Sequence, residues 1–157
     1  PMGALIESMS TLNDTASQAA RSLSTASGGA DPIHAATDVT GFGLLGHLGR
    51  AAMESGIDVA IDVAAVPLLP GTRELAEAGS MPGGSRRNLE WADERLDRGG
   101  FDELDVLLLA DAQTSGGLVF GVDPTEVDGV LADLDSTGHA AAVIGRATAG
   151  SGRITLT

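Results

Sequence analysis

The spacing of apolar side chains along the chain predicts its first helices and strands. Apolar residues recur at steps of three and four over residues 4–24, at Leu5, Met9, Leu12, Ala16, Ala19 and Leu23. This stripe predicts a helix that faces a core or a dimer partner. A short apolar run at residues 33–36 predicts a strand, and residues 43–55 predict a helix that Gly56 ends. Alternation over residues 57–63 predicts a half-buried strand.

The second half of the chain also predicts both helices and strands. Helices are expected after Pro70 as far as Gly79, over residues 89–96, and from Pro124 to Gly138. Residues 80–88 are expected to form a glycine-rich basic loop, and the expected strands are residues 118–122, 140–146 and 153–156. Helices and strands that interleave without a repeat predict an α+β or α/β fold, with a β-sheet covered by helices. The length of 157 residues fits a single domain, residues 1–157.

Composition removes several classes of function. The net charge is −13 and all nine basic residues are Arg, so a nucleic-acid partner is not expected. The absence of Lys excludes a phosphate-binding loop of the Walker type. The absence of Cys excludes disulfides and thiolate metal sites and fits a cytoplasmic protein. No apolar run is long enough to suggest a membrane span. The helix at the very start of the chain suggests a piece of something longer.

Asp38 stands just before a glycine-containing bend and has two interpretations. It could cap the helix that follows, which the spacing alone favours. It could instead supply a hard oxygen to Mg²⁺, an ion usually held by one or two carboxylates together with substrate phosphates. Residues 41–46 also match the dinucleotide-binding pattern GxGxxG. We reject that match, because a carboxylate beside the glycines would repel a pyrophosphate.

Two further loops offer groups that could contact a nucleotide. Residues 83–88 offer backbone N–H groups and two guanidiniums, which suit phosphate oxygens, although a solvated turn fits equally well. Residues 114–117 offer hydroxyls and a flexible backbone, although a tight entry into a strand explains them too. The candidate binding residues are Gly84, Ser85, Arg86, Thr114, Ser115 and Gly116.

Three stretches together resemble a known family. Residues 34–48 (HAATDVTGFGLLGHL) closely resemble the signature of the selenophosphate synthetases, also called selenide, water dikinases. Residues 82–88 (PGGSRRN) and 113–118 (QTSGGL) match in the same order, and Met9, Leu12 and Asn13 resemble the start of the C-terminal domain of that family. One departure is Asp111-Ala112, where the family often has Asp-Pro.

The resemblance implies a fold, a reaction and a site. The fold would be that of the C-terminal domain of the aminoimidazole ribonucleotide synthetase superfamily. The family makes selenophosphate, AMP and phosphate from ATP, selenide and water, with Mg²⁺. The reactive Cys or selenocysteine, the catalytic Lys and most metal ligands belong to an N-terminal domain, so no catalytic residue is expected in this chain.

Under the same resemblance, Asp38 matches an aspartate that the C-terminal domain adds to the metal cluster, and the enzyme would be a homodimer with ATP at its interface. We therefore expect a domain that is inactive alone and whose partner is the missing N-terminal domain. The alternatives are a stand-alone binding or dimerisation module, and a domain of a related ATP-dependent synthetase or kinase.

Overall fold

The structure is a computed structural model that describes residues 2–14, 17–18 and 32–157. Its helical elements are α1 (Met2–Ser10), α3 (Gly43–Ser55), the 3-10 turn η1 (Val63–Ala65), α4 (Thr72–Glu77), α5 (Gly83–Asp93), α6 (Glu103–Leu109) and α7 (Val127–Ser136). Its strands are β1 (Ile33–Asp38), β2 (Ile57–Ile61), β3 (Leu96–Asp97), β4 (Leu118–Val122), β5 (Gly145–Ala149) and β6 (Ile154–Leu156).

The strands form two separate sheets. β1 and β4 make an antiparallel ribbon, and the other strands make a four-stranded sheet in the order β3-β6-β2-β5. In that sheet β6 runs parallel to both β2 and β3, whereas β5 is antiparallel to β2. The predicted α+β class, with a mixed sheet covered by helices, is therefore confirmed. Because β1 and β2 lie in different sheets, the segment around the GxGxxG match is not a parallel βαβ unit.

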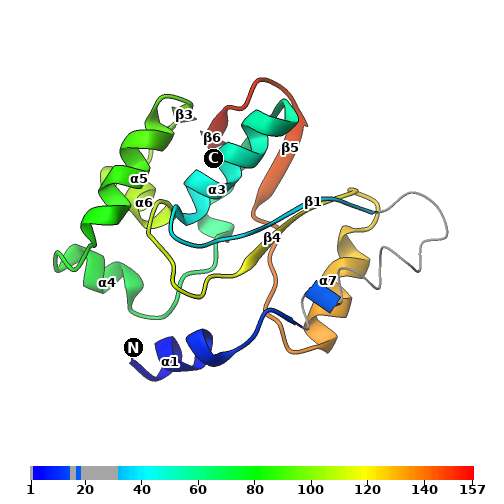
Figure 1. Cartoon of the computed structure of the whole chain (residues 1–157), viewed down its shortest axis with the longest axis horizontal. Helices are drawn as coiled ribbons and strands as arrows, with labels where there is room; N and C mark the ends of the chain where they lie inside the picture. The colour runs from blue at the N-terminus through cyan, green and yellow to red at the C-terminus, as the bar shows by residue number, and fades with distance from the viewer. Residues whose placement is uncertain (1, 15–16, 19–31) are drawn as a thin grey trace.

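The main core lies where the helices meet the four-stranded sheet. Its buried side chains come from α3, α5, α6 and the strands β2 and β6, and include Leu44, Leu45, Ile61, Leu89, Val106, Leu107, Leu109, Ile154 and Leu156. In Figure 1 the ribbon of β1 and β4 runs across the middle of the molecule, with α3, α5 and α6 at one end and α7 at the other. A second, small cluster packs Val130 and Leu134 of α7 against Leu118 and Val122 of β4.

Several predicted elements are confirmed. Helix α3 spans the expected residues, and Gly56 ends it in the left-handed conformation at φ 64°, where its N–H donates to the carbonyl of Ala52. The predicted strands at the positions of β1, β4 and β6 also form. Pro124 and Gly138 bracket α7 as expected.

The described residues 4–10, 14 and 17–18 of the helix predicted over residues 4–24 are helical, but the prediction of one continuous helix is wrong, because α1 ends at Ser10 and residues 11–13 are not helical. The hydroxyls of Ser10 and Thr11 both donate to the carbonyl of Glu7 and so satisfy an acceptor of the last turn. Asn13 then donates its side-chain amide to the carbonyl of Gly116, which draws the chain out of the helical path. Residues 15–16 and 19–24 of the predicted helix lie outside the described residues.

Three other boundaries differ from the predictions. The basic loop is expected over residues 80–88, but residues 83–88 form the first half of α5, which starts after the extended Pro82. The strand β2 stops at Ile61, because the carboxylate of Asp62 accepts the N–H of Ala64 and starts η1. The strand expected from residue 140 begins only at Gly145.

Candidate functional site

Asp38 is the last residue of β1, where it pairs with Leu118 of β4. Its side chain is exposed, and its carboxylate makes no hydrogen bond or ion pair with any residue that the structure describes. The interpretation of Asp38 as a helix cap is wrong, because the cap position of α3 is Phe42 and no side chain caps this helix. The carboxylate is therefore held at a strand end, facing solvent and available to a ligand.

The turn between Asp38 and α3 is held by local hydrogen bonds. The N–H of Gly43 donates to the carbonyl of Thr40 at 2.9 Å. The Nε2 atom of His47, one turn into α3, accepts the N–H of Thr40 at 3.1 Å and lies 3.0 Å from its hydroxyl. Phe42 is 67% exposed, and its ring lies 5.7 Å from that of His47. The two rings therefore lie beside each other where this turn meets α3.

The loop at residues 113–117 lies directly beside this turn. The N–H of Val39 donates to the carbonyl of Gly117 at 2.9 Å, and the N–H of Gln113 donates to the carbonyl of Thr40 at 3.1 Å. A Cβ atom on Gly116 would overlap the carbonyl oxygen of Val39, so this contact requires glycine. Thr114 and Ser115 are exposed beside it. Two of the three sequence motifs thus form one surface.

The third motif meets the other two through α5. Ser85 is completely buried, and its hydroxyl donates to Oδ1 of Asp111 at 2.6 Å. Gly84 lies half-buried in the first turn. Arg86 is exposed and pairs with Glu103 of α6 at 3.2 Å. Ser85 thus has a hydrogen-bond partner and Arg86 an ion-pair partner within the chain. That either residue contacts a nucleotide stays a prediction.

Sequence reasoning missed two residues that connect the motifs. Asn88 lies in α5 and donates its side-chain amide to the carbonyl of Gly41 in the turn after Asp38 and to the carbonyl of Ala110, at the end of α6. Asp111 accepts from Ser85 and also lies 3.3 Å from the amide of Gln113. Their presence inside or beside the matched stretches was the only signal available, because spacing along the sequence does not show which loops meet in space.

The described residues do not form a complete metal site. Within the described ranges, no group of three or more His, Asp or Glu side chains is arranged to hold a metal. Asp38 offers a hard oxygen of the kind that Mg²⁺ binds, and the exposed carboxylate leaves room for further ligands. The chemistry of Asp38 therefore fits one ligand of a Mg²⁺ ion, and the described residues hold no complete set of ligands.

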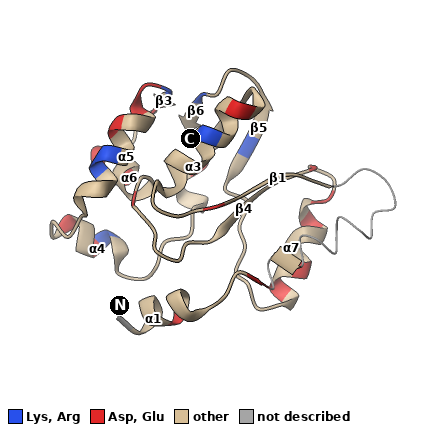
Figure 2. Cartoon of the chain, in the orientation of Figure 1, with Lys and Arg blue, Asp and Glu red and all other residues tan. Residues whose placement is uncertain are grey.

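Charged side chains are distributed unevenly over the fold. Figure 2 shows basic residues on α3, α4, α5 and β5, whereas α1 and α7 contain acidic residues but no basic ones. The pKa of Asp58 is lowered because its carboxylate accepts the N–H groups of Arg153 and Ser151. The pKa of Asp123 is lowered by hydrogen bonds from the hydroxyl and the N–H of Thr125. Neither carboxylate lies in the three motifs.

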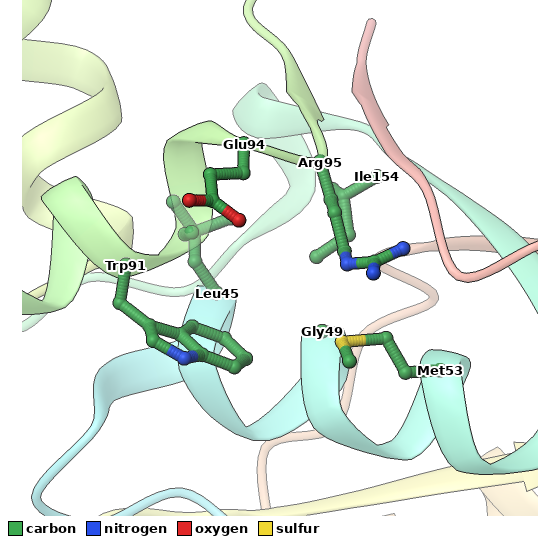
Figure 3. A pocket seen from close by; sticks show the side chains of 8 residues that line it. Leu45, Gly49, Met53, Trp91, Glu94, Arg95 and Ile154 are labelled. Carbon is green, nitrogen blue, oxygen red and sulfur yellow. The ribbon is translucent and has the colours of Figure 1, made fainter.

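A small pocket lies apart from these loops, between α3, α5 and β6. Its volume is about 110 Å³, and its lining residues are Leu45, Gly49, Met53, Trp91, Ala92, Glu94, Arg95 and Ile154. Figure 3 shows the indole of Trp91 and the side chain of Met53 on opposite sides, with Glu94 and Arg95 above them. None of the residues predicted from the sequence to bind metal or nucleotide lines this pocket.

Comparison with known proteins identifies the class of domain. The profile of the family described as AIR synthase related protein, C-terminal domain, matches residues 7–156. The chain therefore belongs to this family, and the expected superfamily fold is confirmed. Hydrogenase maturation protein HypE has a crystal structure that resembles this one at a TM-score of 0.49 and 21% identity, over 80% of this chain and 34% of that chain.

The curated relatives that the chain matches are more specific. The selenide, water dikinase of Porphyromonas gingivalis is 46% identical over 118 residues, which are 74% of this chain and 34% of that protein. The enzyme of the same name from Carboxydothermus hydrogenoformans is 36% identical over 153 residues, which are 97% of this chain and 42% of that protein. The resemblance that the three motifs indicated is thus confirmed, and the chain spans well under half the length of these relatives.

No helix in the described part of the chain is both long enough and apolar enough to cross a membrane.

Proposed function

We propose that this chain is the C-terminal domain of an enzyme that makes selenophosphate from selenide, ATP and water, releasing AMP and phosphate. The observation that carries the proposal is the position of Asp38. Its carboxylate is exposed at the end of β1 inside the family signature, and it makes no hydrogen bond or ion pair with a described residue. The curated relatives that the chain matches are named selenide, water dikinase.

The role of the domain would be to hold Asp38 as one ligand of a Mg²⁺ ion shared with the rest of the enzyme. Bound Mg²⁺ would neutralise charge on the phosphates during phosphoryl transfer, a reaction that depends chiefly on positioning and electrostatic stabilisation. The residues of this chain fix where the carboxylate stands. The pairing of Asp38 with Leu118 fixes the position of Asp38 along the ribbon of β1 and β4. The backbone hydrogen bonds of Val39 and Thr40 hold the turn that follows Asp38.

The remaining parts of the enzyme would come from a preceding domain and a second copy. The curated relatives are more than twice as long as the stretch they share with this chain. We propose that an N-terminal domain supplies the nucleophile, the lysine, most metal ligands and most contacts with ATP. The first turn of α5, which carries Gly84, and the loop that carries Thr114, Ser115 and Gly116 would face that domain.

The test is Asp38→Asn in a full-length polypeptide that contains this domain. We expect Mg²⁺-dependent AMP formation to fall by more than about 100-fold, since loss of even an outer partner of a metal ligand costs roughly 10–100-fold. The measurement is selenide-dependent AMP release over a Mg²⁺ titration. Asp128 is an exposed aspartate on α7, so Asp128→Asn is the matched control. Its Mg²⁺-dependent AMP formation should equal that of the unchanged enzyme. Normal turnover by Asp38→Asn with unchanged melting would contradict the proposal.

A dimerisation module is the second candidate, and α1 favours it. Leu5, Ile6 and Met9 of this helix are 41%, 61% and 47% exposed, and Leu12 beyond it is 70% exposed. Exposed apolar side chains on one helix are typical of a surface that binds a partner. Equilibrium sedimentation of the chain tests this candidate: self-association that Ile6→Glu abolishes would support it, and a monomeric chain would contradict it. The third possibility, a related ATP-dependent enzyme, would show AMP or ADP formation without selenide.

A further inference from the structure

One side chain joins two of the three motifs. The amide nitrogen of Asn88 donates to the carbonyl of Gly41 at 2.9 Å and to the carbonyl of Ala110 at 3.0 Å. Both acceptors are backbone carbonyls, so the nitrogen and not the oxygen of the amide must face them. Gly41 belongs to the turn that follows Asp38, and Ala110 precedes the loop of residues 111–117. Asn88 thus links the turn of the candidate ligand to the neighbouring loop.

The helix that carries Asn88 is itself anchored to the same loop. Ser85 lies three residues earlier on α5, which places both side chains on one face of the helix. The buried hydroxyl of Ser85 donates to Asp111, the residue next to Ala110. Leu89 and Ala92 of α5 are buried in the main core. The donor nitrogen of Asn88 is therefore presented from a rigid support.

The backbone beside these bonds is closely packed. Gly43 has φ 66°, and a Cβ atom built on it would lie 2.6 Å from the carbonyl carbon of Ala110. The turn after Asp38 therefore rests directly on the segment that Asn88 also holds. Without the hydrogen bonds from Asn88, the turn after Asp38 would lose its support from α5.

We propose that Asn88 is a positioning residue for Asp38. It holds the turn of residues 39–42 against α5 and the loop of residues 111–117, so that the carboxylate is already placed when a metal ion binds. This inference rests on the proposed function of Asp38 as a shared Mg²⁺ ligand. Outer partners that orient a metal ligand commonly change metal affinity or activity by about 10–100-fold when removed.

The first test uses Asn88→Asp and Asn88→Ala in the full-length enzyme, with Glu90→Ala as the matched control. Asp has the shape of Asn, but its carboxylate would face two carbonyl oxygens and could not donate. Glu90 is exposed on the same helix and makes no hydrogen bond or ion pair with a described residue. We expect both Asn88 variants to raise the Mg²⁺ concentration for half-maximal AMP formation by about 10-fold or more. A purely structural role would lower activity at every Mg²⁺ concentration without moving this midpoint.

The second test measures the turn without metal or activity. In the chain of 157 residues, the amides of Val39, Thr40 and Gly43 should exchange hydrogen faster in both Asn88 variants than in the unchanged chain, and Glu90→Ala should leave the rates unchanged. Unchanged exchange would overturn the inference. Loss of cooperative folding in both Asn88 variants would also overturn it, because Asn88 would then serve the stability of the whole domain.

The outcomes separate this inference from the proposed function. If Asp38→Asn abolishes the response to Mg²⁺ while both Asn88 variants keep the normal midpoint, the positioning role is wrong and the proposed function stands. If Asp38→Asn also keeps the normal midpoint and activity, both are wrong. A shifted midpoint together with faster exchange in the Asn88 variants supports the inference.

Discussion

At the scale of single residues, Asp58 shows how one carboxylate organises a turn. It lies in β2, and its Oδ1 atom accepts the N–H of Ser151 at 2.7 Å and the N–H of Arg153 at 2.9 Å. These bonds stabilise the charged form, which lowers the pKa of Asp58 below its ordinary value of 3.8. The carboxylate thereby fixes the turn between β5 and β6, which brings β6 into the sheet.

The lowered pKa gives Asp58 a defined effect on stability as the pH changes. A carboxylate whose pKa is lower in the folded state stabilises fully above its unfolded pKa and loses this effect as the pH falls through the folded pKa. We expect Asp58→Ala to unfold at a lower urea concentration than the unchanged chain at pH 7. The difference should shrink as the pH falls below about 3.8. Urea midpoints measured from pH 7 to pH 2.5 check this.

Glu90→Ala serves as the control for Asp58, since Glu90 makes no hydrogen bond or ion pair with a described residue. It should leave the urea midpoint unchanged at pH 7. The difference in urea midpoint between Asp58→Ala and the unchanged chain could instead stay constant down to pH 2.5. That result would show that the charge of Asp58 does not stabilise the turn.

At the scale of elements, the start of α3 depends on one glycine of the signature and not on its neighbour. Gly43 has φ 66°, and a Cβ atom there would lie 2.6 Å from the backbone of Ala110. A Cβ atom on Gly41 would meet nothing within 4 Å, and its φ lies outside the left-handed region. The two glycines stand two residues apart, so they form a matched pair.

We expect Gly43→Ala to lower the free energy of unfolding by at least ~2 kcal/mol, because the left-handed backbone alone costs about 1–2 kcal/mol for an L-residue and the clash adds to it. For a chain of this size that is a fall in melting temperature of roughly 4–8 °C. Gly41→Ala should stay within about 0.5 kcal/mol of the unchanged chain. Thermal melts of the two variants check this, and equal melting would show that the turn adapts freely.

Helix α5 shows why a local pattern misled the prediction at this scale. Gly83 and Gly84 are weak helix formers, and two arginines beside them suggested a solvated loop. The helix forms because Ser85, Leu89 and Ala92 are buried against the core and because Pro82 is extended at its start. Tertiary packing therefore overrides the low intrinsic propensity of its first turn.

At the scale of the whole molecule, Asp38 is a candidate metal ligand without a complete ligand set among the described residues. The described residues hold no group of three or more metal-ligating side chains, and Asp38 has no carboxylate partner there. We expect the chain of 157 residues alone to form no AMP from ATP and selenide at any Mg²⁺ concentration. The measurement is AMP release, with the full-length enzyme as the positive control. Selenide-dependent AMP release by the chain alone would contradict the division of ligands between two domains.

The sequence by itself determined the elements with strong local signals and the family. The apolar spacing of α3, its end at Gly56 and the strands at β1 and β4 follow from local periodicity and from glycine conformation, which depend on neighbouring residues. The signature around Asp38 identified the relatives that comparison then found. It also singled out the carboxylate, whose binding of metal stays a prediction.

Only the tertiary structure decided how the motifs meet. It showed that Asp38 ends a strand instead of capping a helix, that residues 83–88 are helical, and that α1 ends early. It also showed that Asn88 bonds to Gly41 and Ala110, which lie 47 and 22 residues away in the chain. Local periodicity reports which face of an element is buried. Hydrogen bonds between distant loops depend on how the elements pack, which no local pattern encodes.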